Sequence, residues 1–228
     1  MFTRVAIFLF AAFLTGCAVK PQMPVSLDKS TLGPATGKVG VAMATLPKVD
    51  TSLPGAGCLL CIAVATAANS TLIDYSRTLS KEDMLPLKED MAKALREKGV
   101  DAVVIADEIN MQSLEKNASE GENLARKDFS SLRTKYRIDK LMLVEVDFIG
   151  LERQYSSYIP SSPPKAVVRG KGYMVDLKSN AYLWYLPLNE IRGTDAEWDE
   201  PPKFPGLTNA YYQAIESGKD RIMDGLRK

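Results

Sequence analysis

Apolar residues recur at helical spacing in three segments, which we expect to form amphipathic helices. The clearest begins after Ser80, which has capping-box spacing with Asp83, and ends before Gly99, where a C-terminal cap belongs. The second is expected over residues 122–136, and the third closes the chain after a cap near Thr208. Their predicted apolar faces are Met84, Leu87, Met91 and Leu95; Ala125, Phe129, Leu132 and Tyr136; and Tyr211, Ile215, Ile222 and Leu226.

Short apolar or alternating runs between these segments predict strands at 38–44, 100–106, 141–148, 165–177 and 181–186. Helical connections between the early strands favour parallel pairing, whereas the last two strands, joined by a polar turn at 178–180, form an antiparallel hairpin. The sequence therefore predicts an α/β (α+β) fold. We expect a single mixed sheet flanked by helices, in the order β-α-α-β-α-β-β-β-α.

Residues 58–68 are almost wholly apolar and follow a Pro-Gly-Ala-Gly breaker. The segment is too short to cross a bilayer, so we expect a helix. Two interpretations remain open for the whole segment Gly55–Ala68. It packs as a core helix over one face of the sheet, which we favour, or it dips into a membrane or joins copies of the chain.

The first residues combine the basic Arg4 with a short apolar run that ends in Leu14-Thr15-Gly16-Cys17. This pattern resembles the signal of bacterial lipoproteins, in which the chain is cut before the cysteine and its thiol is acylated. Ala18 in place of an aspartate resembles the pattern for delivery to the outer membrane. The resemblance implies a signal peptide at 1–16, a lipidated N-terminus with a flexible tether at 17–37, and one periplasmic domain at 38–228.

Charge and composition exclude several classes of function. The chain has 29 basic and 28 acidic residues, and residues 1–16 contribute one base and no acid, so the mature chain balances at 28 of each. Nothing in this balance attracts nucleic acid. Histidine is absent, which removes Ser-His-Asp and Cys-His catalysis and imidazole metal ligands. We expect no metal, no cofactor and no enzymatic activity, and we interpret Glu145 and Asp147, on one face of a predicted strand, as a solvated pair.

Cys58 and Cys61 are an even pair once Cys17 carries lipid, in an oxidising compartment. We predict that they form a local disulfide. Their spacing is also that of a redox CxxC motif, but the apolar residues around them indicate burial, which raises a thiol pKa.

Two loops carry aromatic residues among polar residues and prolines. Tyr155 and Tyr158 lie in the loop 154–164, and Trp198 and Phe204 lie in the acidic, proline-rich loop 192–206. Exposed aromatic rings are favoured anchors at protein interfaces, so we take these four as candidate partner-binding residues. The alternative is that the rings cover the core of the domain itself.

The chain also resembles a group of envelope lipoproteins that includes the curli secretion lipoprotein and the lipoprotein activators of penicillin-binding proteins. The resemblance is carried by residues 39–46, 95–105, 132–146 and 172–178, and by a hairpin in which Asp176 precedes the turn and Trp184 lies on the return strand. It implies a lipid-anchored accessory or scaffold protein that faces the periplasm and binds another envelope protein. An oligomer-forming component of a secretion complex is the alternative. The apolar segment at 58–68 departs from the group.

Overall fold

The computed structural model describes residues 21–28, 30 and 32–227, and it is built around one mixed sheet with the strand order β3-β1-β4-β7-β8. β1 (Val39–Met43) pairs in parallel with β3 (Ala102–Val104) and with the first part of β4 (Lys140–Glu152). β4, β7 (Lys165–Asp176) and β8 (Tyr182–Arg192) are antiparallel neighbours. The predicted fold class, with parallel early strands and an antiparallel hairpin, is confirmed.

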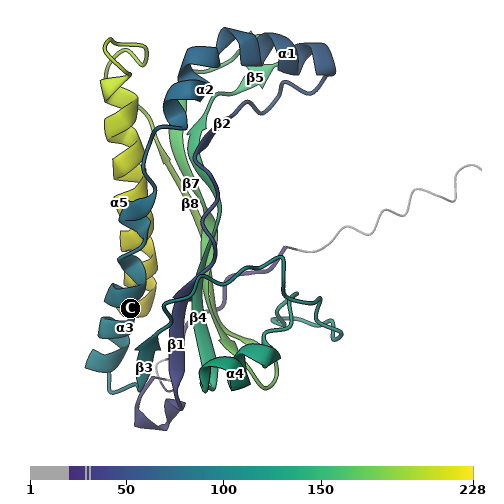
Figure 1. The fold of residues 1–228 in the computed structure, drawn as a ribbon, viewed down its shortest axis with the longest axis vertical. Coiled ribbons are helices and arrows are strands. Elements are labelled where there is room, and N and C mark those ends of the chain that lie inside the picture. The colour runs from purple at the N-terminus through teal and green to yellow at the C-terminus, as the bar shows by residue number, and fades with distance from the viewer. Residues whose placement is uncertain (1–20, 29, 31, 228) are drawn as a thin grey trace, which may run out of the picture.

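Two helices cover one face of this sheet, on the left in Figure 1: α3 (Leu87–Glu97), preceded by a 3₁₀ turn at Glu82–Met84, and α5 (Pro205–Arg227). Their apolar faces are those that the periodicity predicted, because burying these stripes against the sheet is what stabilises amphipathic helices. Gly99 follows α3 with a φ of +80°, a conformation that suits the predicted cap. The fully buried residues of these two helices include Leu87, Met91, Leu95, Tyr211, Ile215 and Ile222.

Among the described residues, α4 (Ser130–Tyr136) and the segment before it cover the lower part of the opposite face. The helix predicted over 122–136 is therefore wrong in its first half. Ala125 and Phe129 are buried as expected, but the Ala125 N–H donates to the carbonyl of Asn180 (2.8 Å), so this stretch pairs with the β7–β8 turn instead of with itself. The Asp128 carboxylate accepts the Ser130 N–H (2.8 Å) where the helix begins.

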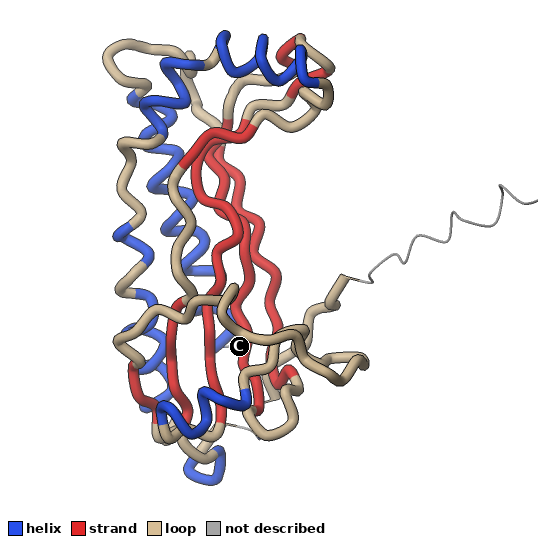
Figure 2. The backbone as a smooth tube through the Cα atoms, turned by 45° about the vertical axis from the view of Figure 1, so that its right-hand side comes forward, coloured by secondary structure: helices blue, strands red, loops and turns tan. Residues whose placement is uncertain are grey.

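Two of the three antiparallel strands, β4 and β8, are longer than the sequence predicted. β4 continues to Glu152 and β8 to Arg192, and a short strand that was not predicted, β2 (Asp50–Ser52), pairs in parallel with the end of β4. This extension carries four small elements at its far end: α1 (Leu59–Ala68), α2 (Ser70–Ser76), β5 (Tyr155–Ser156) and β6 (Ile159–Pro160). Figures 1 and 2 both show them at the top of the molecule, beyond the body of the sheet.

Residues 22–28, which belong to the segment predicted as a tether over 17–37, lie against the body of the protein. Val25 forms an antiparallel bridge with Tyr185 of β8 through two backbone hydrogen bonds of 2.9 Å. The Gln22 side-chain amide donates to the Asn123 Oδ1 (2.8 Å), and Leu27 packs against the main core. The part of the predicted tether from Gln22 to Asp28 is thus held at the edge of the sheet. The predicted lipid site, Cys17, lies outside the described residues.

Candidate functional site

The far end of the molecule is free of charge over two segments of the chain. Residues 51–73 and 154–164 contain no Asp, Glu, Lys or Arg, although these residue types make up 25% of the sequence. The fold brings the two segments together, since α1 and the β5–β6 hairpin meet beyond the end of β4 (Figure 1). We call α1 together with the hairpin the apolar tip.

Most apolar side chains of α1 face solvent. Leu59 is 90% and Leu60 72% exposed, and Tyr158 and Ile159 of the adjoining hairpin are 61% and 58% exposed. Ile62 and Val64 are exposed as well. A helix that is apolar on all sides is normally buried, and contiguous apolar surface on a soluble domain marks an interaction site. The tip therefore has the surface of a docking element.

The core-helix interpretation of residues 58–68 is wrong. α1 does not lie on the sheet, and its buried side is limited to Cys61 and Ala65, which contact Ala56 and Tyr155 in a small cluster of their own. The physical reason is geometric. α1 lies beyond the end of β4 and projects to the side of the sheet opposite α5 (Figure 1), where the described residues that it packs against are those of this small cluster.

A buried polar network fixes the position of α1. Asn69, which separates α1 from α2, donates its side-chain amide to the carbonyl of Ala65 and to the Tyr155 hydroxyl, both at 2.6 Å. Its Oδ1 accepts from Arg153 (2.9 Å), whose guanidinium lies 4.7 Å above the Trp198 ring. The two helices meet at this residue at an angle of 74°. The apolar helix is thus held rigidly although it makes few apolar contacts.

Replacing Asn69 with alanine is expected to loosen the tip selectively. The change leaves the Tyr155 hydroxyl and the Arg153 guanidinium without their buried partner, at a cost of about 1–3 kcal/mol. Hydrogen exchange of the α1 amides should accelerate by about tenfold or more, because 1.4 kcal/mol corresponds to a factor of ten. Asn189→Ala, at an exposed position of β8, is the control. Unchanged exchange in α1 would show that the network does not hold the helix.

The four aromatic residues proposed as anchors have different environments. Tyr155 is 6% exposed and belongs to the core of the tip, so the docking interpretation does not hold for it. Trp198 and Phe204 are half-buried and pack against the main core. Their rings stack on each other with the centroids 6.1 Å apart. Their acidic loop folds back onto the domain because Arg153 attracts the Trp198 ring and the Tyr75 ring contacts that of Phe204, with the ring centroids 5.3 Å apart. Tyr158 is exposed and stays a candidate.

Cys58 and Cys61 are joined by a disulfide at the beginning of α1, with their Cα atoms 4.9 Å apart. Cys58 is also the N-cap of the helix, and its sulfur accepts the N–H of Cys61 (3.0 Å). The loop that the bond closes is very short, so the entropic stabilisation is well below the roughly 3 kcal/mol of a fifteen-residue loop. Its local effect is to fix the turn from which Leu59 and Leu60 protrude.

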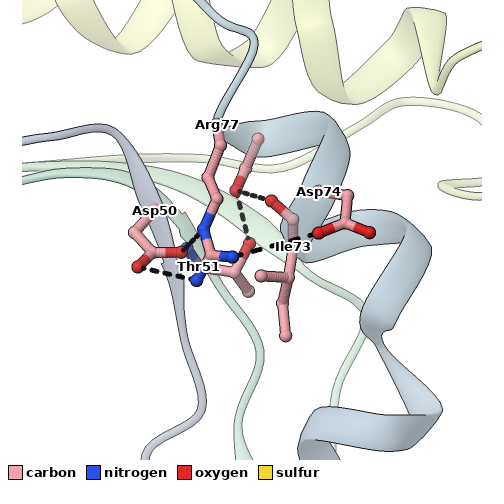
Figure 3. Close-up of polar contacts among 6 residues, drawn as sticks. Asp50, Thr51, Ile73, Asp74 and Arg77 are labelled. Carbon is pink, nitrogen blue, oxygen red and sulfur yellow. Dashed lines mark hydrogen bonds and ion pairs between the residues drawn. The ribbon is translucent and has the colours of Figure 1, made fainter.

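A groove of about 460 Å³ runs between β2, α1 and α2, and α1 contributes Ile62 and Thr66 to its wall. Figure 3 shows its polar edge, where Arg77 pairs with Asp50 (3.1 Å) and Asp74 (3.9 Å), and where Asp50 accepts the Thr51 N–H (2.9 Å). These ion pairs are largely exposed and contribute little to stability. The apolar residues that line the groove are Leu53, Pro54, Ala56, Ile62 and Ile73.

The two carboxylates on β4 are held by a cation from the neighbouring strand. The Lys171 Nζ lies 3.1 Å from Glu145 and 3.0 Å from Asp147, and the Tyr173 hydroxyl donates to Glu145 (3.0 Å). Burial and the adjacent Glu145 charge raise the pKa of the Tyr173 hydroxyl well above its usual value, which keeps it protonated as a donor. The arrangement is an ion network across β4 and β7 and differs from the freely solvated pair that the sequence suggested.

Neither a metal site nor a membrane span is apparent in the part of the chain that the structure describes. Within residues 21–28, 30 and 32–227, no group of three or more Asp, Glu or Cys side chains is placed to hold a metal ion. No single helix among the same residues is long and apolar enough to span a bilayer, and α1 and α2 reach that length only as a bent pair.

Comparison with known proteins finds similarity only at the level of structure. No protein-family model and no curated protein sequence matches the chain. A PelC dodecamer from Paraburkholderia phytofirmans is 12% identical with a TM-score of 0.38, over 90% of this chain and 94% of that one. Lipoprotein GNA1162 from Neisseria meningitidis is 12% identical (TM-score 0.34, 79% and 94%), and the hypothetical protein CT253 from Chlamydia trachomatis is 8% identical (TM-score 0.34, 83% and 97%). At these values we transfer no functional residue from them.

Proposed function

We propose that this chain is a non-catalytic accessory protein of the bacterial envelope, anchored in the outer membrane by lipid on Cys17 and facing the periplasm, which binds another envelope protein through the apolar tip. The lipoprotein-like signal at the N-terminus supports the location. The observation that carries the binding role is the exposure of Leu59 and Leu60 on a helix that the body of the protein does not cover.

Solvated apolar side chains on a rigid helix stabilise a complex when a partner covers them. Burial of a leucine or isoleucine side chain contributes about 1.5–3 kcal/mol relative to exposure. Because the disulfide and the Asn69 network already fix α1, little conformational entropy is lost when it docks. The tip is thus organised before it meets a partner.

Charge and shape favour a protein partner over a lipid surface. Helices that bind at membrane interfaces generally carry a lysine- and arginine-rich polar face, and α1 has no charged residue. The charged residues that flank the two uncharged segments are Asp50, Asp74, Arg153 and Lys165, two of each sign, so they do not attract anionic lipid. The groove beside α1 offers a concave site for a partner side chain, as interface anchors require.

Site-specific photocrosslinking in intact envelopes tests this proposal. A photoreactive residue at Leu60 or Val64 should yield a product of one defined larger mass, whereas the same residue at Leu85, a partly exposed leucine outside the tip, should not. A product that contains two copies of this chain would favour the oligomeric alternative. Adducts to lipid alone, or equal products at all three positions, would contradict binding of a protein by the tip.

A further inference from the structure

The segment Gln22–Asp28 is part of the folded body and covers an edge of the sheet. β8 is the last strand in the sheet order. On its outer side, the backbone N–H and carbonyl of Tyr185 each form a 2.9 Å hydrogen bond with the backbone of Val25. Gln22 is joined to Asn123 in the long loop between β3 and α4. A lipid on Cys17 is therefore connected to a fixed point on the domain by a very short piece of chain.

The length of that piece sets how far the domain can move from the bilayer. Five residue steps separate Gln22 from Cys17 (22 − 17), and an extended chain spans at most about 3.6 Å per residue, which gives about 18 Å. A tether that extended to residue 37 would have allowed several times that distance. We propose that Gln22–Asp28 is a strut that holds the domain against the lipid headgroups, with α5 on the far side, so that the apolar tip meets its partner beside the bilayer.

The orientation follows from where the chain enters the fold. Figures 1 and 2 both show the first described residues on the side of the sheet opposite α5, and α1 projects toward this same side. Across the sheet, Val25 is in register with Tyr185 of β8, Tyr185 with Tyr173 of β7, and Tyr173 with Leu143 of β4. Leu143 therefore marks the level of the strut on β4. From Leu143 to Glu152, where β4 ends, are nine residue steps of about 3.3 Å, so the tip lies about 30 Å from the strut along the strands.

Electrostatic attraction does not produce this arrangement. The segment 107–128, which includes Asn123, has six acidic and three basic residues, so it does not favour an anionic surface. The attachment depends on the predicted lipid and on the strut, and the inference therefore rests on the proposed function. It specifies the partner as an integral protein of the same membrane that presents a surface next to the bilayer.

Energy transfer to headgroup acceptors in liposomes tests the strut with the full lipidated protein. A fluorescent amino acid at Ser119, in the loop beside the strut, should be strongly quenched, and one at Gln213, on the exposed side of α5, only weakly. Inserting a twenty-residue Gly-Ser linker between Pro21 and Gln22 adds about 25 Å of root-mean-square reach and should abolish most of this difference. The linker should also reduce the photocrosslinks from Leu60 several-fold.

The outcomes separate this inference from the proposed function. Equal quenching at Ser119 and Gln213 in the unmodified protein, or quenching that the linker leaves unchanged, overturns the strut. Failure of the unmodified protein to bind liposomes also overturns it, because the predicted lipid would then be absent. If the quenching differs as expected but Leu60 yields no crosslink to protein at either linker length, the strut stands and binding through the tip fails.

Discussion

Replacing Trp184 with alanine is expected to lower the free energy of unfolding by about 3–5 kcal/mol, the range for large-to-small changes at buried aromatic residues. Trp184 is 2% exposed and lies between β7 and α5, where two glycines make room for its ring. A Cβ atom at Gly172 would lie 2.9 Å from the ring, and one at Gly225 would lie 2.8 Å from it. With the ring removed, neither glycine can fill the space.

Thermal unfolding of the protein produced without the predicted lipid measures this effect. For a chain of this size the change corresponds to a fall of roughly 6–20 °C in Tm. Ile191→Ala, at an exposed position of the same strand, should change stability by no more than about 0.5 kcal/mol. A Tm for Trp184→Ala that matches this control would contradict the packing of α5 on the hairpin.

The double substitution Leu59→Ser and Leu60→Ser is expected to remove partner binding while leaving the fold intact. Both side chains are mostly exposed, so each change should alter stability by less than about 0.5 kcal/mol. Interface anchors contribute about 2 kcal/mol or more of binding energy, which corresponds to a loss of at least about 30-fold in affinity. With a photoreactive residue placed at Tyr158, the yield of crosslinked product in intact envelopes should fall accordingly.

Ile191→Ser is the matched control for this experiment, since it places serine at another exposed apolar position outside the tip. It should leave the crosslink from position 158 unchanged. Equal yields from the double variant and the control would show that the two leucines do not anchor the partner. A large fall in the Tm of the double variant would mean that they support the fold.

The helices α3 and α5 could be predicted because their apolar periodicity reports directly on burial against a sheet. The parallel arrangement of β1 and β3 could be predicted because helices connect the two strands. The helix predicted over 122–136 is wrong in its first half, although the apolar periodicity there also reports burial correctly. Ala125 and Phe129 are buried at helical spacing, but backbone pairing with Asn180, distant in sequence, takes the place of the helical hydrogen bonds. A pattern of burial does not specify which groups form hydrogen bonds with the backbone N–H and carbonyl of the buried residues.

The exposure of α1 could not be read from its composition, because a core helix and a docking helix have the same apolar residues. The exposure of the helix depends on whether another layer covers it, and that depends on how far β4 and β7 extend. Similarly, we took Trp198 as a candidate anchor because its loop is acidic and rich in proline, whereas Arg153, which contacts the ring, comes from a distant part of the chain. The absence of charge at both 51–73 and 154–164 was the available sign that these segments form one surface.

Carbene footprinting of the apolar tip in three environments shows whether another protein covers it, without knowledge of the partner. We expect strong labelling of residues 59–64 in the purified protein and in the lipidated protein on liposomes, and labelling several-fold weaker in intact envelopes. Leu85 should be labelled alike in all three. Equal labelling of the tip in envelopes and on liposomes would contradict the claim that another envelope protein covers it.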